Sequence, residues 1–481
     1  MQLRAIQRIV GILLVLFSVT MLPPIVVAWI TGEQTVRMFL AAFMITLFSG
    51  VILWLPARAF IKELRLRDGF MIVAMFWVVL GVFGAFPFIL DSHLPYIDAI
   101  FESVSGLTTT GSTVFTHIDD MPRSILYYRQ QLQWLGGMGI IVLAVAILPM
   151  LGIGGMQLYR AETPGPMKDN KLTPRITETA KALWYIYLGL TIACATAYWL
   201  AGMPVFDAIT NSFSTVSLGG LSTHDTSFAY FDNVFIEVAA IIFMLLSGVN
   251  FAIHFIAWRN ISLNPYIRDP EFRAYVLIVG VSAMITTVYL YASGTFASAG
   301  SALRYGIFQT VSFGTTTGFT TAAYPSWPAF VPALLLVISF IGGCAASTSG
   351  GLKVIRVLLL WKQGMREIKR LIHPSGQFSI KIGEKSLPGP VVHAIWGFFM
   401  LYMVCFTVMS LLLAATGLDL VTSFSAVAAC LNNTGTGLGA VGSNFATINT
   451  TAKSILCVAM LLGRLEIFTL LVLFTPAFWK K

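Results

Sequence analysis

The chain alternates between long apolar runs and short polar connections. Ten of the runs are long enough to cross a bilayer as helices, which takes about 20 mostly apolar residues. They cover residues 9–30, 36–57, 70–90, 131–153, 183–203, 234–257, 274–294, 329–360, 391–415 and 453–478. Arg4 and Arg8 precede the first run, as in a signal peptide, but apolar residues continue past Pro23 and Pro24. We therefore expect a retained helix rather than a cleaved leader.

Four shorter apolar segments follow the third, fifth, seventh and ninth runs. Each leads into a stretch rich in threonine, serine, asparagine or glycine, and these stretches are residues 105–113, 214–223, 312–321 and 431–439. As helices, segments 98–108 and 207–217 would extend about 16 Å, which is half of the roughly 30 Å hydrocarbon core. We expect such segments to enter the membrane and return, with their irregular backbone buried in protein or facing water.

This repetition predicts the architecture. We expect an all-α polytopic membrane protein with ten transmembrane helices, in which four parallel helix–re-entrant pore loop–helix repeats surround one pore. Two extra N-terminal helices precede the repeats. The expected units are the leading pair in residues 1–68 and the pore repeats in residues 69–160, 161–260, 261–372 (with a broken second helix) and 373–481.

Composition argues against a soluble protein. Apolar types make up 57% of the 481 residues and charged types 11%, whereas an ordinary soluble domain has about 25% charged residues. The five cysteines are scattered without a C-x-x-C pair, so the sequence gives no support to a structural zinc or redox site.

The basic residues are distributed unevenly among the predicted connections. If the N-terminus is cytoplasmic, 24 of the 30 lysines and arginines fall on the inner side, as the positive-inside rule requires. Both termini are then cytoplasmic, and the net charge of +9 faces the cytoplasm and its anionic membrane lipid. No nucleic-acid partner is expected, because the charge is split among several short loops.

The four polar stretches suit a monovalent cation. Threonine and glycine offer carbonyl and hydroxyl oxygens without a full charge, and a ring of such oxygens can replace the water shell of an ion. Each half-length helix also directs its partly negative C-terminal end toward the membrane centre. The alternative for any single stretch is a close helix-packing contact between small residues.

The chain resembles a known family. The run Asn432-Asn433-x-Gly435-x-Gly437-Leu438-Gly439, the pair Gly463-Arg464 and the two leading helices are similar to the Trk/Ktr/HKT superfamily of potassium transporters, closest to the bacterial TrkH type. The resemblance implies a potassium uptake protein of the bacterial inner membrane, with K+ as the transported ion and no covalently bound cofactor.

The resemblance also implies which residues bind potassium. The selectivity filter would be formed by Thr110, Gly111, Ser112, Gly219, Gly220, Leu221, Thr317, Gly318, Phe319, Asn433, Thr434, Gly435, Thr436 and Gly437. Many TrkH-type relatives have proline between the two glycines of the fourth stretch, where this chain has Thr436. The sequence leaves open whether Gly435 or Gly437 matches Gly318.

The eighth apolar run contains an unusual polar interruption. Residues 329–341 are apolar, and small or hydroxyl-bearing residues then follow as far as Lys353. Such residues favour a break in the helix and a loop inside the membrane, and in the superfamily a similar stretch is a movable loop below the filter. The candidate gate residues in it are Gly342, Gly343, Gly350, Gly351 and Lys353. The alternative is a helix-packing face of small residues.

Arg464 is a second candidate gate residue. It lies eleven residues after Lys453, about 16 Å along a helix, where a charge is costly and usually functional. The resemblance suggests that its side chain faces the pore below the filter and opposes cation flux. The alternative is an arginine paired with a carboxylate or with carbonyl groups of another helix.

The predicted inner loops are too short to form a nucleotide-binding domain. The resemblance implies a cytosolic NAD(H)- or ATP-binding regulatory subunit as a partner, and a homodimer. The competing functions are a polytopic membrane enzyme acting on lipid, a sensor or assembly protein, and a sodium or non-selective permease of the same fold. Coupling of the flux to H+ or Na+, as in symport, also stays open.

Overall fold

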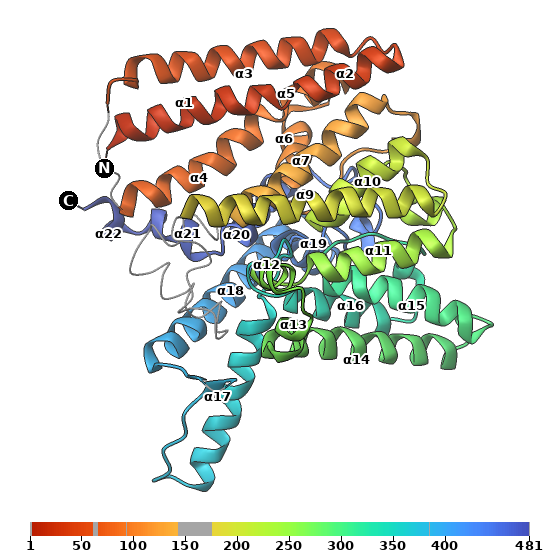
Figure 1. Ribbon diagram of the computed structural model, residues 1–481, viewed down its shortest axis with the longest axis vertical. Coiled ribbons are helices and arrows are strands. Elements are labelled where there is room, and N and C mark those ends of the chain that lie inside the picture. Colours follow the sequence, from red (N-terminus) through yellow and green to blue (C-terminus); the bar gives the residue numbers. More distant parts are fainter. Residues whose placement is uncertain (1, 61–65, 93, 143–175, 384, 481) are drawn as a thin grey trace.

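The computed structural model describes residues 2–60, 66–92, 94–142, 176–383 and 385–480, and these are mostly helical (Figure 1). The longer helices are α1 (Leu3–Val19), α2 (Leu22–Thr31), α3 (Val36–Ala57), α4 (Leu66–Phe83), α6 (Tyr96–Leu107), α7 (Arg123–Val142), α9 (Ile176–Leu200), α10 (Val205–Ser217), α11 (Val234–Ser247), α12 (Phe251–Asn260), α14 (Pro270–Ala292), α15 (Ala299–Gly314), α16 (Phe330–Ile341), α17 (Val354–Ile372), α18 (Gly389–Ala415), α19 (Leu420–Leu431) and α20 (Thr450–Arg464). Short helices are α5 (Phe86–Ser92), α13 (Asn264–Arg268), α21 (Phe468–Leu471) and α22 (Pro476–Trp479).

Six of the described helical segments are long and apolar enough to cross a membrane. They are Leu3–Thr31, Val36–Ala57, Arg67–Leu90, Lys181–Leu200, Pro270–Ala292 and Gly389–Ala415. The number rises to as many as eight if two bent helix pairs each count as one span. The expected count of ten stays a prediction, and part of the expected span 131–153 lies outside the described residues.

Two expected spans differ from a straight helix. The expected span 234–257 is bent by 97° between α11 and α12, and the expected span 453–478 is bent by 111° after α20. At the first bend, the side chain of Asn250 accepts a hydrogen bond from the backbone of Ala252, 2.9 Å away, and so caps the new helix. Apolar periodicity alone does not reveal such a break, because residues on both sides of it remain apolar.

The leading helices α1 and α3 pack closely through glycine. A Cβ atom on Gly11 would lie 2.7 Å from the backbone nitrogen of Trp54, and one on Gly50 would lie 2.8 Å from the backbone nitrogen of Val15. Helices inside a bilayer gain mainly from van der Waals packing, so small residues at the contact favour this close approach.

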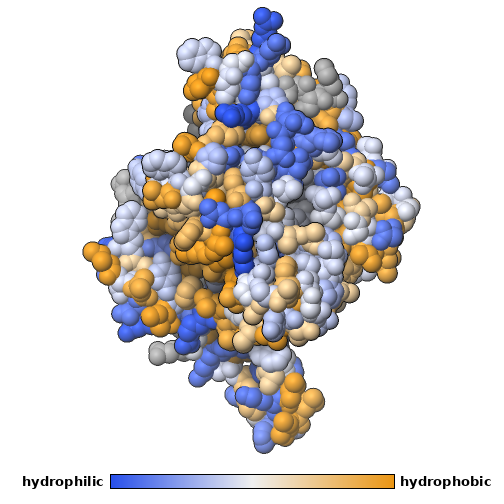
Figure 2. All heavy atoms as spheres, turned by 90° about the vertical axis from the view of Figure 1, so that its right-hand side faces the viewer, coloured by the Kyte–Doolittle hydropathy of each residue, from blue (hydrophilic) through white to orange (hydrophobic). Residues whose placement is uncertain are grey.

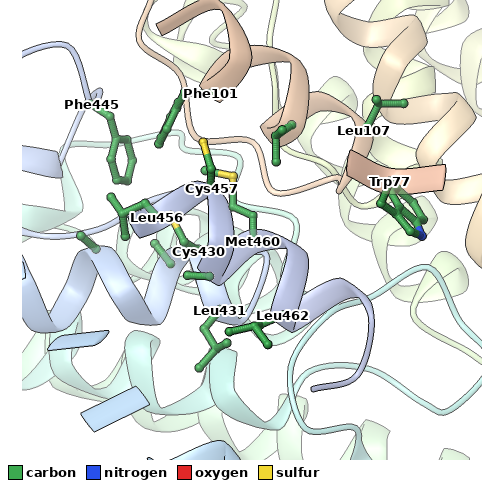
Figure 3. Packing of buried hydrophobic residues seen from close by; sticks show 14 of the residues in the cluster. Trp77, Phe101, Leu107, Cys430, Leu431, Phe445, Leu456, Cys457, Met460 and Leu462 are labelled. Carbon is green, nitrogen blue, oxygen red and sulfur yellow. The ribbon is translucent and has the colours of Figure 1, made fainter. Parts of the chain in front are cut away.

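Four half-length helices, α6, α10, α15 and α19, lie between longer ones. Most of their residues are buried, and they pack against the helices of neighbouring repeats. Near α6, α19 and α20, for example, Phe101, Cys430, Phe445, Leu456 and Met460 belong to one apolar cluster (Figure 3). These helices therefore lie in the core and position the loops that follow them.

The chain between α16 and α17 is not helical. α16 ends at Ile341 and α17 begins at Val354. In Figure 1, α17 projects away from the body of the molecule, and a short hairpin of β1 (Lys381–Ile382) and β2 (Lys385–Ser386) follows it. The interruption leaves residues 342–353 inside the helical body.

Candidate functional site: a ring of four loops

The loops that follow α6, α10, α15 and α19 meet in a closed ring. Each contains one ring glycine with a positive φ angle, and these are Gly111 (85°), Gly220 (79°), Gly318 (86°) and Gly435 (86°). Each of them lies against the carbonyl oxygen of the next loop. A Cβ atom on Gly111 would lie 2.1 Å from the carbonyl oxygen of Gly219, and one on Gly220 would lie 1.9 Å from that of Thr317. A Cβ atom on Gly318 would lie 2.0 Å from the carbonyl oxygen of Thr434, and one on Gly435 would lie 2.3 Å from that of Thr110.

These contacts run from the first loop to the second, third and fourth, and back to the first. Four segments that touch in this cyclic order surround a common axis. Glycine is needed at each contact for two reasons: it adopts positive φ without strain, and it has no Cβ to displace the neighbouring carbonyl group.

The backbone aligns the fourth loop with the other three. Two residues before each ring glycine, the φ angle is also positive, and these residues are Thr109 (51°), Leu218 (55°), Thr316 (60°) and Asn433 (53°). Gly435 therefore matches Gly318. Gly437 lies outside the ring, where its carbonyl oxygen accepts a hydrogen bond from the hydroxyl of Tyr324. Thr436 lies between the two glycines, and its hydroxyl has no partner among the described residues.

Polar side chains join the loops to one another. The Ser112 hydroxyl donates to the carbonyl oxygen of Gly435 at 3.1 Å. The Asn433 amide donates to the Thr110 hydroxyl at 2.9 Å and to the carbonyl oxygen of Met460 at 3.1 Å. These bonds link the fourth loop to the first, although the two are more than 300 residues apart in the sequence.

Hydroxyl groups also hold the residues that follow the second and third ring glycines. The Ser214 hydroxyl of α10 donates to the carbonyl oxygen of Leu221 at 2.7 Å, and the Ser312 hydroxyl of α15 donates to that of Phe319, also at 2.7 Å. The half-length helices therefore fix their own loops.

Several supporting residues were not singled out as site residues from the sequence. The Gln133 side chain on α7 donates to the carbonyl oxygen of Gly219 at 2.6 Å and accepts from the backbone of Leu221 at 3.2 Å. Behind the first loop, the buried Glu102 carboxylate accepts from Arg129 at 2.8 Å and from the backbone of Val114 at 3.0 Å. The sequence signal that could have pointed to this pair is a charged residue inside or beside each of two apolar segments, Glu102 in 98–108 and Arg129 just before 131–153.

The loop of residues 342–353, called the intramembrane loop after its expected position, is bonded to residues at or just after the ends of three of the four half-length helices. The backbone nitrogen of Gly351 donates to the carbonyl oxygen of Asn432 at 3.1 Å. The backbone nitrogen of Gly350 donates to the Thr316 hydroxyl at 2.7 Å, and the Thr348 hydroxyl donates to the carbonyl oxygen of Val216 at 3.0 Å. The loop therefore packs where the half-length helices α10, α15 and α19 end.

The small residues of this loop allow close contact. A Cβ atom on Gly350 would lie 2.0 Å from the carbonyl oxygen of Asn432, one on Gly342 would lie 2.2 Å from that of Gly350, and one on Gly343 would lie 2.8 Å from that of Gly248. Gly351, like Gly342, has a positive φ angle. The glycine content that marked this stretch in the sequence thus corresponds to backbone packing against backbone.

Two buried cations lie beside the loop. Arg464, the last residue of α20, is 6% exposed, and its guanidinium donates to the carbonyl oxygen of Thr348 at 3.0 Å. Its two other nitrogens have no hydrogen-bond partner among the described residues. The Lys353 ammonium donates to the carbonyl oxygen of Ser349. Glu466 pairs with Arg356 at 2.8 Å rather than with Arg464.

A buried glutamate side chain also holds the loop. Glu271, in the first turn of α14, accepts a hydrogen bond from the backbone nitrogen of Ala345 at 2.6 Å. The sequence does not point to this residue, because Glu271 and Ala345 are 74 positions apart and nothing in the local pattern connects them.

A histidine joins two connections of the first and second repeats. His224 lies 2.5 Å from Asp119 and 3.7 Å from Asp207, and its ring stacks on Tyr230 with the centroids 3.5 Å apart. Partial burial alone would lower the pKa of His224, but the hydrogen bonds and charges of Asp207 and Asp119 outweigh this and raise it.

Figure 2 looks onto the side of the molecule opposite the chain ends and shows hydrophilic groups in several patches.

A helical membrane protein in which four loops bring uncharged oxygens around one axis has the form of a cation transporter. The family comparison agrees with this class, since residues 35–481 match the TrkH family, which is described as a cation transport protein. The chain belongs to this family.

Individual relatives are similar over the entire chain. A Trk system potassium uptake protein TrkH from Vibrio parahaemolyticus is 55% identical over 485 residues and covers 100% of both sequences. A TrkG protein of the same system from Escherichia coli is 45% identical and covers 99% of both. The crystal structure of the potassium transporter TrkH from Vibrio parahaemolyticus superimposes with a TM-score of 0.93 at 52% identity, covering 100% of both chains. These relatives are named as transporters and not as enzymes.

Proposed function

We propose that this chain takes up potassium ions across the bacterial inner membrane through the ring of four loops. The observation that carries this proposal is the cyclic contact of the ring glycines with the carbonyl oxygens of Thr110, Gly219, Thr317 and Thr434. The names of the relatives agree with potassium as the ion.

The chemistry of the ring suits a monovalent cation. The carbonyl groups carry partial charges only, so they can replace the water shell of an ion that must also leave again. The Thr434 and Thr436 hydroxyls have no hydrogen-bond partner among the described residues and remain available as further oxygen ligands. The two ends of the pathway then differ in charge, with His224 and its aspartates on one side and Lys353 and Arg464 on the other.

The intramembrane loop and Arg464 form the gate in this proposal. The loop packs against the ends of three half-length helices, and a guanidinium beside a cation pathway opposes flux electrostatically. Opening requires the Arg464–Thr348 and Gly351–Asn432 hydrogen bonds to break. Glycine in the loop lets the backbone change conformation at small steric cost.

Control from the cytoplasm would come through a partner. We propose that both termini are cytoplasmic, that the chain forms a homodimer, and that a cytosolic subunit binding NAD(H) or ATP docks on the basic inner connections. Nucleotide added to the purified chain alone should then leave flux unchanged, whereas nucleotide added to the chain with its partner should change it.

The test is growth of an uptake-deficient bacterium on low potassium, followed by isotope flux in reconstituted vesicles. Rescue, together with K+ flux that exceeds Na+ flux, supports the proposal. Equal fluxes of the two ions would favour a non-selective or sodium permease, and no flux of either ion would contradict the transport function. Setting the H+ and Na+ gradients separately decides whether the flux is passive or symport.

A further inference from the structure

A cavity of about 750 Å³ lies between α11, α14 and α15, within the roughly 300–1,000 Å³ typical of small-molecule sites. Its lining is apolar except for Tyr275, whose hydroxyl is bonded to the backbone of Leu245 at 3.3 Å, and Thr287. Water is poorly held in a cavity of this kind because it finds too few polar partners. The natural occupant is therefore an apolar group.

The cavity adjoins the surface of α14 that would face lipid. Val276 and Met284 line it and are 49% and 62% exposed, respectively. Between them, Gly280 leaves open space, since a Cβ atom there would have no neighbour within 4 Å. A flexible apolar chain from the bilayer can lie along this helix without displacing protein atoms.

A positive charge lies in line with the cavity at the beginning of α14. Arg273 is exposed, and it precedes Val276 by three residues and Gly280 by seven, so all three lie on one face of the helix. Its guanidinium has no hydrogen bond within the described part of the chain, although its charge interacts with that of Asp269 four residues earlier. Basic residues between membrane helices at their cytoplasmic ends are suited to bind anionic lipid headgroups.

We propose that this cavity binds a phospholipid with an anionic headgroup, with one acyl chain between α11 and α14 and the phosphate at Arg273. The apolar lining and the open space at Gly280 account for the chain, and Arg273 accounts for the preference in headgroup charge. The length of the cavity, from Phe272 to Val288 along α14, extends about 24 Å at 1.5 Å per residue, which suits an extended acyl chain.

The bound chain would contact the segment that holds the intramembrane loop. Val249 lines the cavity, and the adjacent Gly248 accepts a hydrogen bond through its carbonyl oxygen from the backbone nitrogen of Cys344 at 2.8 Å. Occupancy should therefore stabilise the bend between α11 and α12 and the closed position of the loop. This effect on flux rests on the proposed function, whereas lipid binding itself does not.

The first experiment counts the phospholipids that the purified full chain retains, by native mass spectrometry. Gly280→Trp fills the cavity from a position with free space, and Leu277→Trp is the matched control, because Leu277 is 65% exposed on the same helix and does not line the cavity. We expect the wild type and Leu277→Trp to retain a lipid that Gly280→Trp loses. Equal retention by all three would overturn the proposal.

The second experiment tests the headgroup. Wild type and Arg273→Gln are exchanged into vesicles of phosphatidylglycerol mixed with phosphatidylcholine, and the retained lipid is identified. We expect the wild type to enrich phosphatidylglycerol and Arg273→Gln to lose most of this enrichment while still holding one lipid. If the wild type does not enrich phosphatidylglycerol, the proposal is contradicted. Efficient disulfide crosslinking between two copies of the Met284→Cys variant would also contradict the proposal, because a second chain would then cover the cavity.

Discussion

Each ring glycine occupies a position that excludes a side chain. Gly318 combines a φ angle of 86° with a carbonyl oxygen 2.0 Å from the position of a Cβ atom. Either feature alone disfavours a side chain at this position. With both features present, a side chain could fit only if the neighbouring loop moved.

Gly318→Ala should therefore reduce K+ flux at least about fivefold in a normally inserted protein, since backbone strain of about 1–3 kcal/mol falls on one of the four loops proposed to bind the ion. Isotope flux in vesicles measures this. Gly364→Ala is the control, because Gly364 lies in α17 with an ordinary φ angle and free space around its Cβ position. Wild-type flux and selectivity in Gly318→Ala would contradict a role of this glycine in the pathway.

His224 predicts a pH-dependent contribution to stability. Because its pKa is raised in the folded protein by Asp207 and Asp119, the stabilisation is fully present below the ordinary histidine pKa of roughly 6.5 and disappears as the pH rises through the raised value. His224→Gln should lower the free energy of unfolding by roughly 0.5–1 kcal/mol near pH 5.5 and have little effect near pH 9. Thermal unfolding in detergent at both pH values checks this, and a difference that does not change with pH would count against the ion pair.

At the scale of elements, the interrupted helix α16–α17 is held by side chains that come from two other helices. Arg464 on α20 bonds to the intramembrane loop at Thr348, and Glu271 on α14 bonds to it at Ala345. Their conservative replacements should have different effects on flux, because Arg464 contributes a positive charge beside the proposed pathway and Glu271 contributes a hydrogen-bond acceptor.

Arg464→Ala should raise cation flux, since it removes a buried positive charge and a hydrogen bond that holds the loop. Arg464→Lys is the matched variant, which keeps the charge but cannot reproduce the guanidinium geometry, and its flux should fall between the other two. Unchanged or lower flux in a normally inserted Arg464→Ala protein would contradict the barrier role.

Glu271→Ala should also raise flux, whereas Glu271→Gln should stay close to the wild type because an amide oxygen can still accept from the backbone of Ala345. Loss of the acceptor leaves a buried N–H group unpaired, at a cost of roughly 1–3 kcal/mol. Vesicle flux together with the yield of folded protein measures both effects. If both substitutions change flux equally, the charge of Glu271 matters more than this hydrogen bond.

For the whole molecule, the ring closes only if the last repeat meets the first. Lys453 on α20 pairs with Asp98 on α6 at 3.0 Å across 355 positions of sequence, and both side chains are largely buried. The backbone nitrogen of Phe445 also donates to the carbonyl oxygen of Thr113 at 2.7 Å. Together with the bonds between the first and fourth loops, this seam closes the ring.

Lys453→Met should destabilise the protein by roughly 1.5–3 kcal/mol, because it leaves the Asp98 carboxylate partly buried without its charged donor. The double variant Lys453→Met with Asp98→Leu should recover part of this loss in a double-mutant cycle. Thermal unfolding of the four proteins measures the coupling, and strictly additive effects would show that the pair does not hold the seam.

Much of this molecule could be predicted from local sequence because its main constraints are local. A lipid environment forces apolar helices of a certain length, and glycine at positive φ leaves a recognisable residue type at positions such as Gly111 and Gly318. The expectation of a membrane protein related to TrkH was confirmed by the family match. The ring residues lie in the stretches that their composition marked, whereas their role in ion selection stays a prediction.

What the tertiary structure decided concerns residues far apart in the sequence. It aligned Gly435 rather than Gly437 with the other ring glycines and bent the chain after Arg464, whose guanidinium meets Thr348. It also brought Gln133, Glu271 and Lys453 to partners in distant parts of the chain. Side-chain type and spacing determine which helices and turns can form. Contacts between repeats depend on how those helices pack in three dimensions, and a single sequence contains no local pattern for them.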